Sequence, residues 1–162
     1  MPNELDQTTL DAWRRLLFAY ARVIRRLEAD MLEQHDLPIT WFDVLSRLSQ
    51  SPDGRLRMHE LEGVSLFTRS GVTRLADRLE AVGLVRRERS PEDRRGVYLV
   101  ITAAGISKIA EVWPDHTASI QKHFGQYLDA GDAESLRAAT AKILEHDEAF
   151  RRARGDDSSL PR

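Results

Sequence analysis

Small hydroxyl side chains and arginines that suit nucleic-acid recognition are concentrated between residues 68 and 95. They are Thr68, Arg69, Ser70, Thr73, Arg74 and Arg78, followed by Arg94 and Arg95. Hydroxyls and guanidinium groups donate hydrogen bonds to phosphate oxygens, and an arginine can bond both acceptors of a guanine edge. The sequence has no glycine-rich phosphate loop, nucleophile–base motif or paired carboxylates at a strand end, so we expect a binding protein and not an enzyme.

Apolar residues recur through the same segment at helical spacing. The series is Val72, Leu75, Ala76, Leu79 and Val82. This spacing predicts an amphipathic helix with Thr68 as its N-cap and these residues on its inward face. On the opposite face Arg74 can contact a guanine or a phosphate, whereas Arg69 and Arg78 lie toward the flanks and suit phosphates. Asp77 on that face is interpreted as an outward spacer or a salt-bridge partner.

A short hairpin with a basic tip is predicted directly after this helix. Gly83 supplies a left-handed cap at the helix end, and two strands follow, from residue 84 to about 89 and from 97 to 101. We expect Arg94 or Arg95 to enter the minor groove, where narrow A·T tracts attract arginine. Asp93 is expected to orient a neighbouring arginine, since phosphates repel a carboxylate.

Two shorter helices precede this unit. Thr40 is a predicted N-cap for a helix over about 41–49, and a turn follows at 51–54. Leu56 is assigned to a short strand, and a third helix covers about 59–64. Short helix, short helix, amphipathic helix and hairpin in this order form a winged helix-turn-helix, which we assign to residues 37–102.

Longer helices flank this region. Residues 8–34 carry one apolar stripe from Leu10 to Met31, and a helix of that length, about 40 Å, needs a long partner in the chain or in a second subunit. A helix capped by Thr102 is predicted from residue 103, with a kink or break at Pro114, and a last helix covers about 133–151. We therefore expect a mainly α fold with a small β-wing, a helical dimerisation region at 8–36 and 103–151, and a disordered tail at 152–162.

Composition limits the classes of protein that fit. The 162 residues are 41% hydrophobic and 31% charged, with a net charge of −2 and no cysteine. Disulfides, thiol catalysis and Cys-based zinc sites are therefore excluded. Residues 55–95 carry ten arginines against seven carboxylates, a local basic region inside an otherwise acidic chain.

Other kinds of site find little support in the sequence. The five histidines are scattered, so we expect no metal site and no cofactor. No signal peptide or membrane span is predicted, which favours a cytoplasmic protein without a membrane partner.

A pocket for a small effector is a further hypothesis. Its candidate residues are aromatic or titratable and lie on predicted helices: Trp13, Tyr20, Trp41, Trp113 and His116. Aromatic residues on helical stripes usually belong to the core, so the alternative for each of them is a packing role.

Several of these segments together resemble the MarR family of bacterial winged-helix transcriptional regulators. They are residues 68–80, 83–87, 93–95 and 101–105, and the likeness in helix order covers about residues 8–150. The Asp-Arg-Arg at 93–95 followed by Ile-Thr-Ala-Ala-Gly at 101–105 is similar to the family's wing-to-helix signature. The resemblance implies a homodimer joined by the first and last helices, a palindromic operator read by two recognition helices and flanked by wing arginines, and control by a small phenolic or anionic ligand.

These observations favour a sequence-specific DNA-binding transcriptional regulator, a repressor, that works as a homodimer. Its expected partners are double-stranded DNA, a second copy of the chain and a small aromatic or anionic effector. An alternative of another class is a winged-helix protein-interaction module without DNA binding, which would show no salt-dependent affinity for a duplex. A third hypothesis is a small-molecule binding protein without regulatory output.

Overall fold

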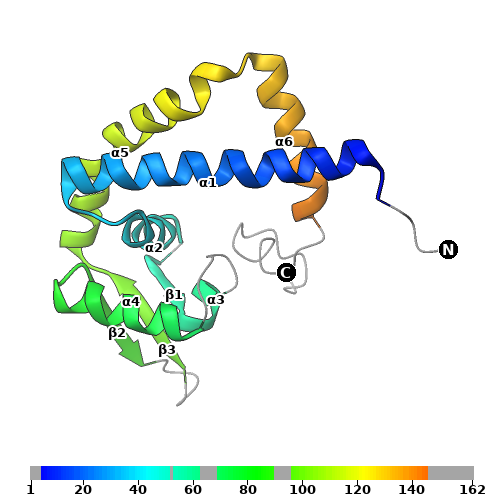
Figure 1. The fold of residues 1–162 in the computed structure, drawn as a ribbon. Coiled ribbons are helices and arrows are strands. Elements are labelled where there is room, and N and C mark those ends of the chain that lie inside the picture. The colour runs from blue at the N-terminus through cyan, green and yellow to red at the C-terminus, as the bar shows by residue number, and fades with distance from the viewer. Residues whose placement is uncertain (1–4, 52, 63–68, 90–95, 146–162) are drawn as a thin grey trace.

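The computed structural model describes residues 5–51, 53–62, 69–89 and 96–145. Along the chain the elements are α1 (Gln7–His35), α2 (Ile39–Gln50), β1 (Arg55–Arg57), α3 (Met58–Glu62), α4 (Arg69–Ala81), β2 (Val85–Arg89), β3 (Val97–Ile101), α5 (Ala103–His123), the 3-10 helix η1 (Gly125–Tyr127) and α6 (Ala130–Leu144). Figure 1 shows α1 crossing the molecule, with α2, α3, α4 and the strands on one side and α5 and α6 arching over the other. The mainly helical fold with a small sheet confirms the predicted fold class.

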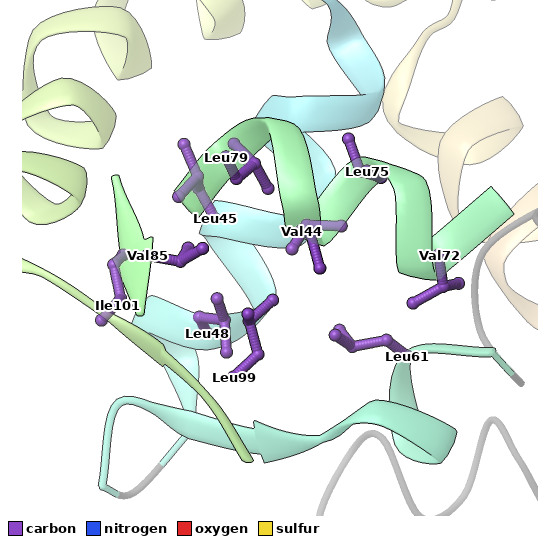
Figure 2. Close-up of a cluster of buried hydrophobic side chains, with 11 residues drawn as sticks. Val44, Leu45, Leu48, Leu61, Val72, Leu75, Leu79, Val85, Leu99 and Ile101 are labelled. Carbon is purple, nitrogen blue, oxygen red and sulfur yellow. The ribbon is translucent and has the colours of Figure 1, made fainter. Parts of the chain in front are cut away.

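One hydrophobic core holds the lobe formed by α2, α3, α4 and the sheet. Figure 2 shows apolar side chains from these elements converging on one another. The buried members are Val44, Leu45, Leu48, Leu61, Val72, Leu75, Ala76, Leu79, Val85, Leu99 and Ile101. Burying one such leucine or valine stabilises the fold by about 1.5–3 kcal/mol, so this core fixes the position of α4 on the strands.

The sheet has three antiparallel strands in the order β1-β3-β2. Val85 lies opposite Ile101 and Arg89 opposite Val97, so β2 and β3 form the predicted hairpin, and the strand assigned to Leu56 joins as β1. Gly83 takes the expected left-handed conformation at the end of α4, with φ of 76°. Val82 was expected to face inward, and that prediction is wrong: it is 56% exposed because α4 ends at Ala81 and the chain turns at this point.

A contact from another helix, and not an N-cap at Thr40, stabilises the start of α2. The prediction of Thr40 as N-cap is wrong: the cap position is Pro38, which makes no side-chain cap bond, and the helix starts at Ile39. The carboxylate of Glu28 in α1 instead accepts a hydrogen bond from the Ile39 amide at 2.6 Å. A carboxylate at this position also interacts favourably with the helix dipole.

Helices α1 and α5 run antiparallel and are joined by histidine–carboxylate contacts. His35 of α1 lies 3.0 Å from Asp115 of α5, and farther along the pair His123 of α5 lies 2.8 Å from Asp30 of α1. Asp30 also accepts a hydrogen bond of 2.6 Å from the Ser119 hydroxyl. These contacts position the long helix against the remainder of the molecule.

Helix α5 begins at Ala103 as predicted, whereas helix α6 begins earlier than predicted. Pro114 does not divide α5, which is one helix from Ala103 to His123: it meets α1 before the proline at Glu111, 3.4 Å from His35, and after it at Ser119, which donates to Asp30. Helix α6 begins at Ala130, three residues earlier than expected, because Asp129 and Asp132 form a reciprocal capping box. The predicted continuation to residue 151 and the tail at 152–162 lie outside the described residues beyond 145.

The first and last helices leave much apolar surface uncovered. Of the predicted stripe on α1, Leu27 and Met31 are buried, but Trp13 is 54% and Leu17 46% exposed. Helix α6 buries none of its described residues, and its Ile143 is 66% exposed. Within the described ranges, no helix is both long and apolar enough to cross a membrane.

Candidate nucleic-acid interface

Helix α4 has an inward apolar face and an outward polar face. Val72, Leu75, Ala76 and Leu79 are buried in the lobe's core. Thr73, Arg74, Asp77 and Arg78 are all exposed. The helical period predicted Val72, Leu75, Ala76 and Leu79 as inward and Thr73, Arg74 and Asp77 as outward, and these assignments are confirmed; Arg78, expected toward the flank, is exposed as well.

Arg74 and Arg78 have no ion-pair partner among the described residues, unlike Arg86 and Arg87 of β2. Their guanidinium groups are exposed on the outward face of α4. An uncommitted guanidinium keeps all its donors for an external acceptor such as a phosphate or a guanine edge. The outward face therefore has the chemistry of a DNA contact surface.

The third charged residue of this face, Asp77, is neutralised from the wing. Its carboxylate lies 2.7 Å from Nη2 of Arg87 in β2, which confirms the salt-bridge interpretation of Asp77. The same guanidinium binds Glu80 through Nη1 at 2.5 Å, and Nη2 lies 3.4 Å from the carbonyl oxygen of Thr73. A carboxylate that would repel DNA is thus held by a cation of the protein itself.

The electrostatics at Arg87 favour its charged form. Partial burial opposes the charge, but hydrogen bonds and charge interactions with Asp77 and Glu80 outweigh it, so the pKa of Arg87 is raised above its ordinary value. Arg87 is therefore a permanent cation of the site.

Five of the eight predicted DNA contacts lie outside the described side chains. Thr68, Arg94 and Arg95 fall in the undescribed ranges 63–68 and 90–95. Arg69 and Ser70 form the first turn of α4, but their side chains are likewise not described. Their assignment to DNA contact, and that of Asp93 to orienting an arginine, stay predictions.

The predicted effector residues do not all come together. Trp113 and His116 of α5 gather with Phe42 of α2, whose ring centroid is 4.3 Å from that of His116 and 6.2 Å from that of Trp113. Trp41 is half-buried and packs against the core of the lobe and against a second apolar cluster of Met31, Leu37, Phe42 and Val112, as Ile109 of α5 also does.

Trp13 and Tyr20 lie in another part of α1. Met31 is the residue of α1 that packs with Phe42. Along the helix axis Trp13 is about 27 Å and Tyr20 about 16 Å from Met31. Two of the five candidates are thus remote from the Phe42 cluster within one chain.

His116 is the least satisfied polar group of that cluster. Its Nδ1 atom is buried and has no hydrogen-bond partner among the described residues. Burial lowers the pKa of His116 below its ordinary value of 6.5, because the charged imidazole would lose hydration. A buried ring nitrogen beside two aromatic rings could bond to a planar ligand. Within the described chain, no cluster of three or more His, Asp or Glu side chains is arranged to hold a metal ion.

Sequence reasoning missed Arg87, Glu80 and Phe42 as members of these sites. Arg87 was counted only as part of the basic segment, although the acid-to-base step from Glu80 across the Gly83 turn could have indicated a helix–strand ion pair. Phe42 follows Trp41 directly, and no spacing rule distinguishes which of two adjacent aromatic residues faces α5.

Comparison with known proteins connects this geometry to one family. A model described as the MarR family matches residues 35–96. The HTH-type transcriptional regulator MhqR of Bacillus subtilis (strain 168) is 31% identical over 111 residues, which are 67% of this chain and 75% of that protein.

Solved structures agree with the sequence comparison. AbsC, a MarR family transcriptional regulator from Streptomyces coelicolor, has a TM-score of 0.78 and 34% identity, covering 88% of this chain and 95% of AbsC. Sco3205, a MarR family regulator from the same organism solved in complex with DNA, has a TM-score of 0.80 and 28% identity. The match covers 90% of this chain and 91% of Sco3205.

Proposed function

Because this chain belongs to the MarR family of transcriptional regulators, we propose that it is a sequence-specific DNA-binding repressor that binds a palindromic operator as a homodimer. Family membership also confirms the expectation of a regulator and not an enzyme. The observation that carries the proposal is the outward face of α4, where Arg74 and Arg78 are exposed and uncommitted while Asp77 is neutralised.

The geometry of α4 suits the major groove. The helix rests on the core through one face and projects the other, as a recognition helix must if its side chains are to reach base edges. The related regulator Sco3205 was solved with DNA bound. Arg94 and Arg95 are proposed as minor-groove contacts, and Thr68, Arg69, Ser70 and Thr73 as contacts of the recognition helix.

The homodimer accounts for the uncovered apolar surface of the terminal helices. Trp13, Leu17 and Ile143 are large apolar side chains left exposed in a single chain. Large apolar side chains left exposed together on helices mark association surfaces. A dimer would place two copies of α4 on two half-sites about one helical turn apart.

Release by a small ligand completes the proposal. The cluster of Phe42, Trp113 and His116 lies where α2 of the DNA-binding lobe meets α5. A planar aromatic ligand there would pack against the rings and accept or donate a hydrogen bond at the unpartnered Nδ1 of His116. Trp13, Tyr20 and Trp41 remain proposed contributors, the first two as residues that a second copy would have to bring close.

Selection of bound duplexes from a random pool tests the DNA-binding proposal. The expected result is a palindrome with half-sites about one helical turn apart, bound with an affinity that falls as salt rises. Placing that palindrome in a promoter should lower reporter output when the protein is present. Absence of any salt-dependent duplex binding would instead favour the protein-interaction module.

Alanine variants of the two uncommitted arginines test the assignment of the face. Arg74→Ala should weaken operator binding by about 1–3 kcal/mol and relax specificity at one base pair. Arg78→Ala should weaken binding uniformly across sequences and reduce the salt slope by about one. Arg26→Ala, on the exposed side of α1, is the control, and fluorescence-anisotropy titrations at several salt concentrations give all three results. Operator affinities unchanged by both α4 variants would contradict the assignment.

A further inference from the structure

The geometry points to Arg87 as a positioning residue that fixes the recognition helix α4 relative to the wing, and so makes their two DNA contacts act together. This inference rests on the proposed DNA-binding function. Arg87 belongs to β2, whereas the groups that its guanidinium meets, Asp77, Glu80 and the Thr73 carbonyl, all belong to α4.

The contacts bridge two elements at several points. Nη1 of Arg87 binds Glu80 at 2.5 Å, and Nη2 binds Asp77 at 2.7 Å. The backbone amide of Arg87 donates a further hydrogen bond of 2.9 Å to the other oxygen of Glu80. Because a planar guanidinium has its donors in a fixed fork, contacts to separate groups restrain orientation as well as distance.

The location of these contacts determines what they restrain. Thr73 and Asp77 lie in the outward half of α4 that carries Arg74, and Glu80 lies one turn nearer its end. Arg87 pairs through β2 with Leu99 of β3, so it is anchored in the middle of the wing sheet. The Arg87 side chain is only 27% exposed and its donors face α4, which sets it apart from the uncommitted Arg74 and Arg78.

The apolar core cannot supply this restraint alone. Leu75, Leu79 and Val85 fix the separation of α4 and β2, but apolar contacts are not directional. A hydrogen-bonded guanidinium at the outer rim adds the directional part. A small rotation of α4 would then break the contacts with Asp77 and Glu80.

A clamp and a direct phosphate contact make opposite predictions for one variant. Glu80→Gln removes a negative charge from the DNA-binding lobe. If Arg87 contacted phosphate, freeing it in this way would strengthen DNA binding. A clamp predicts that Glu80→Gln weakens operator binding, as Arg87→Ala does.

The experiment uses the full chain and the operator obtained by duplex selection, with anisotropy titrations of wild type, Arg87→Ala, Arg87→Lys and Glu80→Gln. Arg87→Ala is expected to lose about tenfold in affinity, and Arg87→Lys less, because an ammonium keeps the charge without the fork. Arg86→Ala is the matched control on the same strand, since Arg86 pairs with Glu88 of its own strand. Far-UV circular dichroism and a melting curve establish the folded fraction of each variant.

A double-mutant cycle with the wing separates positioning from a purely structural role. Arg95→Ala should cost less affinity in the Arg87→Ala background than in wild type, because the wing is no longer held in register with α4. Equal costs in both backgrounds, or tighter binding by Glu80→Gln, would overturn the clamp. In either case wild-type binding to the operator would leave the proposed function standing, whereas wild type without duplex binding would remove both.

Discussion

At the residue scale, the partner of an arginine decides its role more than its position in a basic segment does. Arg74, Arg78 and Arg87 all belong to the segment 55–95 that carries the excess of arginine. Two of them project from α4 without an ion partner in the described structure, while Arg87 is committed to Asp77 and Glu80. Guanidinium donors already used inside the protein restrain the orientation of its elements, and unused ones remain available for the proposed contact with DNA.

His116 gives a prediction at the same scale. Its pKa is lowered by burial, so the folded protein binds this proton less readily than the unfolded chain does. The free energy of unfolding is therefore highest above the unfolded pKa of about 6.5, where His116 is neutral in both states. This contribution is lost as pH falls toward the lower folded pKa.

Replacing the imidazole by a ring that does not titrate should remove this pH dependence. His116→Phe keeps an aromatic ring beside Phe42 and eliminates the unpartnered Nδ1. Thermal midpoints measured between about pH 7.5 and about pH 5 should fall more steeply for wild type than for the variant. His35 and His123 are present in both proteins, so the difference isolates His116. Parallel curves would contradict a burial-lowered pKa.

At the element scale, hydrogen bonds of Thr102 hold together the junction between the wing and α5. Thr102 ends β3, caps α5 by accepting from the Gly105 amide at 3.1 Å, and places its hydroxyl 2.7 Å from the Gly83 carbonyl. The turn after α4, the end of the wing and the start of α5 thus share one residue. Thr102 therefore joins the start of α5 to the turn that follows α4.

Gly105 makes this close approach possible, which a substitution can test. A Cβ at residue 105 would overlap the carbonyl oxygen of Leu84 and lie 2.7 Å from Ile101. Gly105→Ala should destabilise the fold by about 1–3 kcal/mol, because the obstacle is backbone and cannot turn aside. Gly125→Ala is the matched control, since its Cβ would meet only the flexible side chain of Gln121. Chemical denaturation measures both, and equal free energies of unfolding for Gly105→Ala and wild type would disprove the close contact.

At the scale of the whole molecule, a single chain leaves its terminal helices incomplete. Helix α1 is packed at its C-terminal half, where Leu27 and Met31 are buried, but not around Trp13 and Leu17. Helix α6 buries none of its described residues. The proposed dimer would cover these faces and link the two DNA-binding lobes.

An aspartate on the apolar stripe of α1 should prevent that association. Leu17→Asp is expected to shift the protein from dimer to monomer in size-exclusion chromatography with light scattering, since a buried unpaired carboxylate is costly. Operator affinity should fall with it, because two linked half-site contacts become two separate ones. Arg22→Asp, on the opposite side of α1 by the helical period, should remain dimeric. A wild-type protein that is monomeric at micromolar concentration would contradict the dimer.

Much of the architecture follows from local pattern. Helix α4 was predictable because its apolar spacing is regular and Gly83 marks its end. The Thr102 cap was predictable because its hydroxyl directly precedes a helical segment. The start of α2 was not predictable, because Glu28, eleven residues before Ile39, supplies its cap in place of Thr40. For Pro114 the sequence predicted a kink or a break, and α5 is a single helix that contacts α1 before the proline at Glu111 and after it at Ser119.

The sequence by itself determined which faces of the helices are apolar, where the hairpin lies, and that the basic residues are concentrated in the segment of α4 and the hairpin. These are properties of spacing along one element, and the helical and strand periods translate them directly into faces. Tertiary structure alone decided that Arg87 binds Asp77 and Glu80, that His116 lies against Phe42, and that Trp13 stays exposed. Such facts depend on which elements pack together, and packing is set by the whole core.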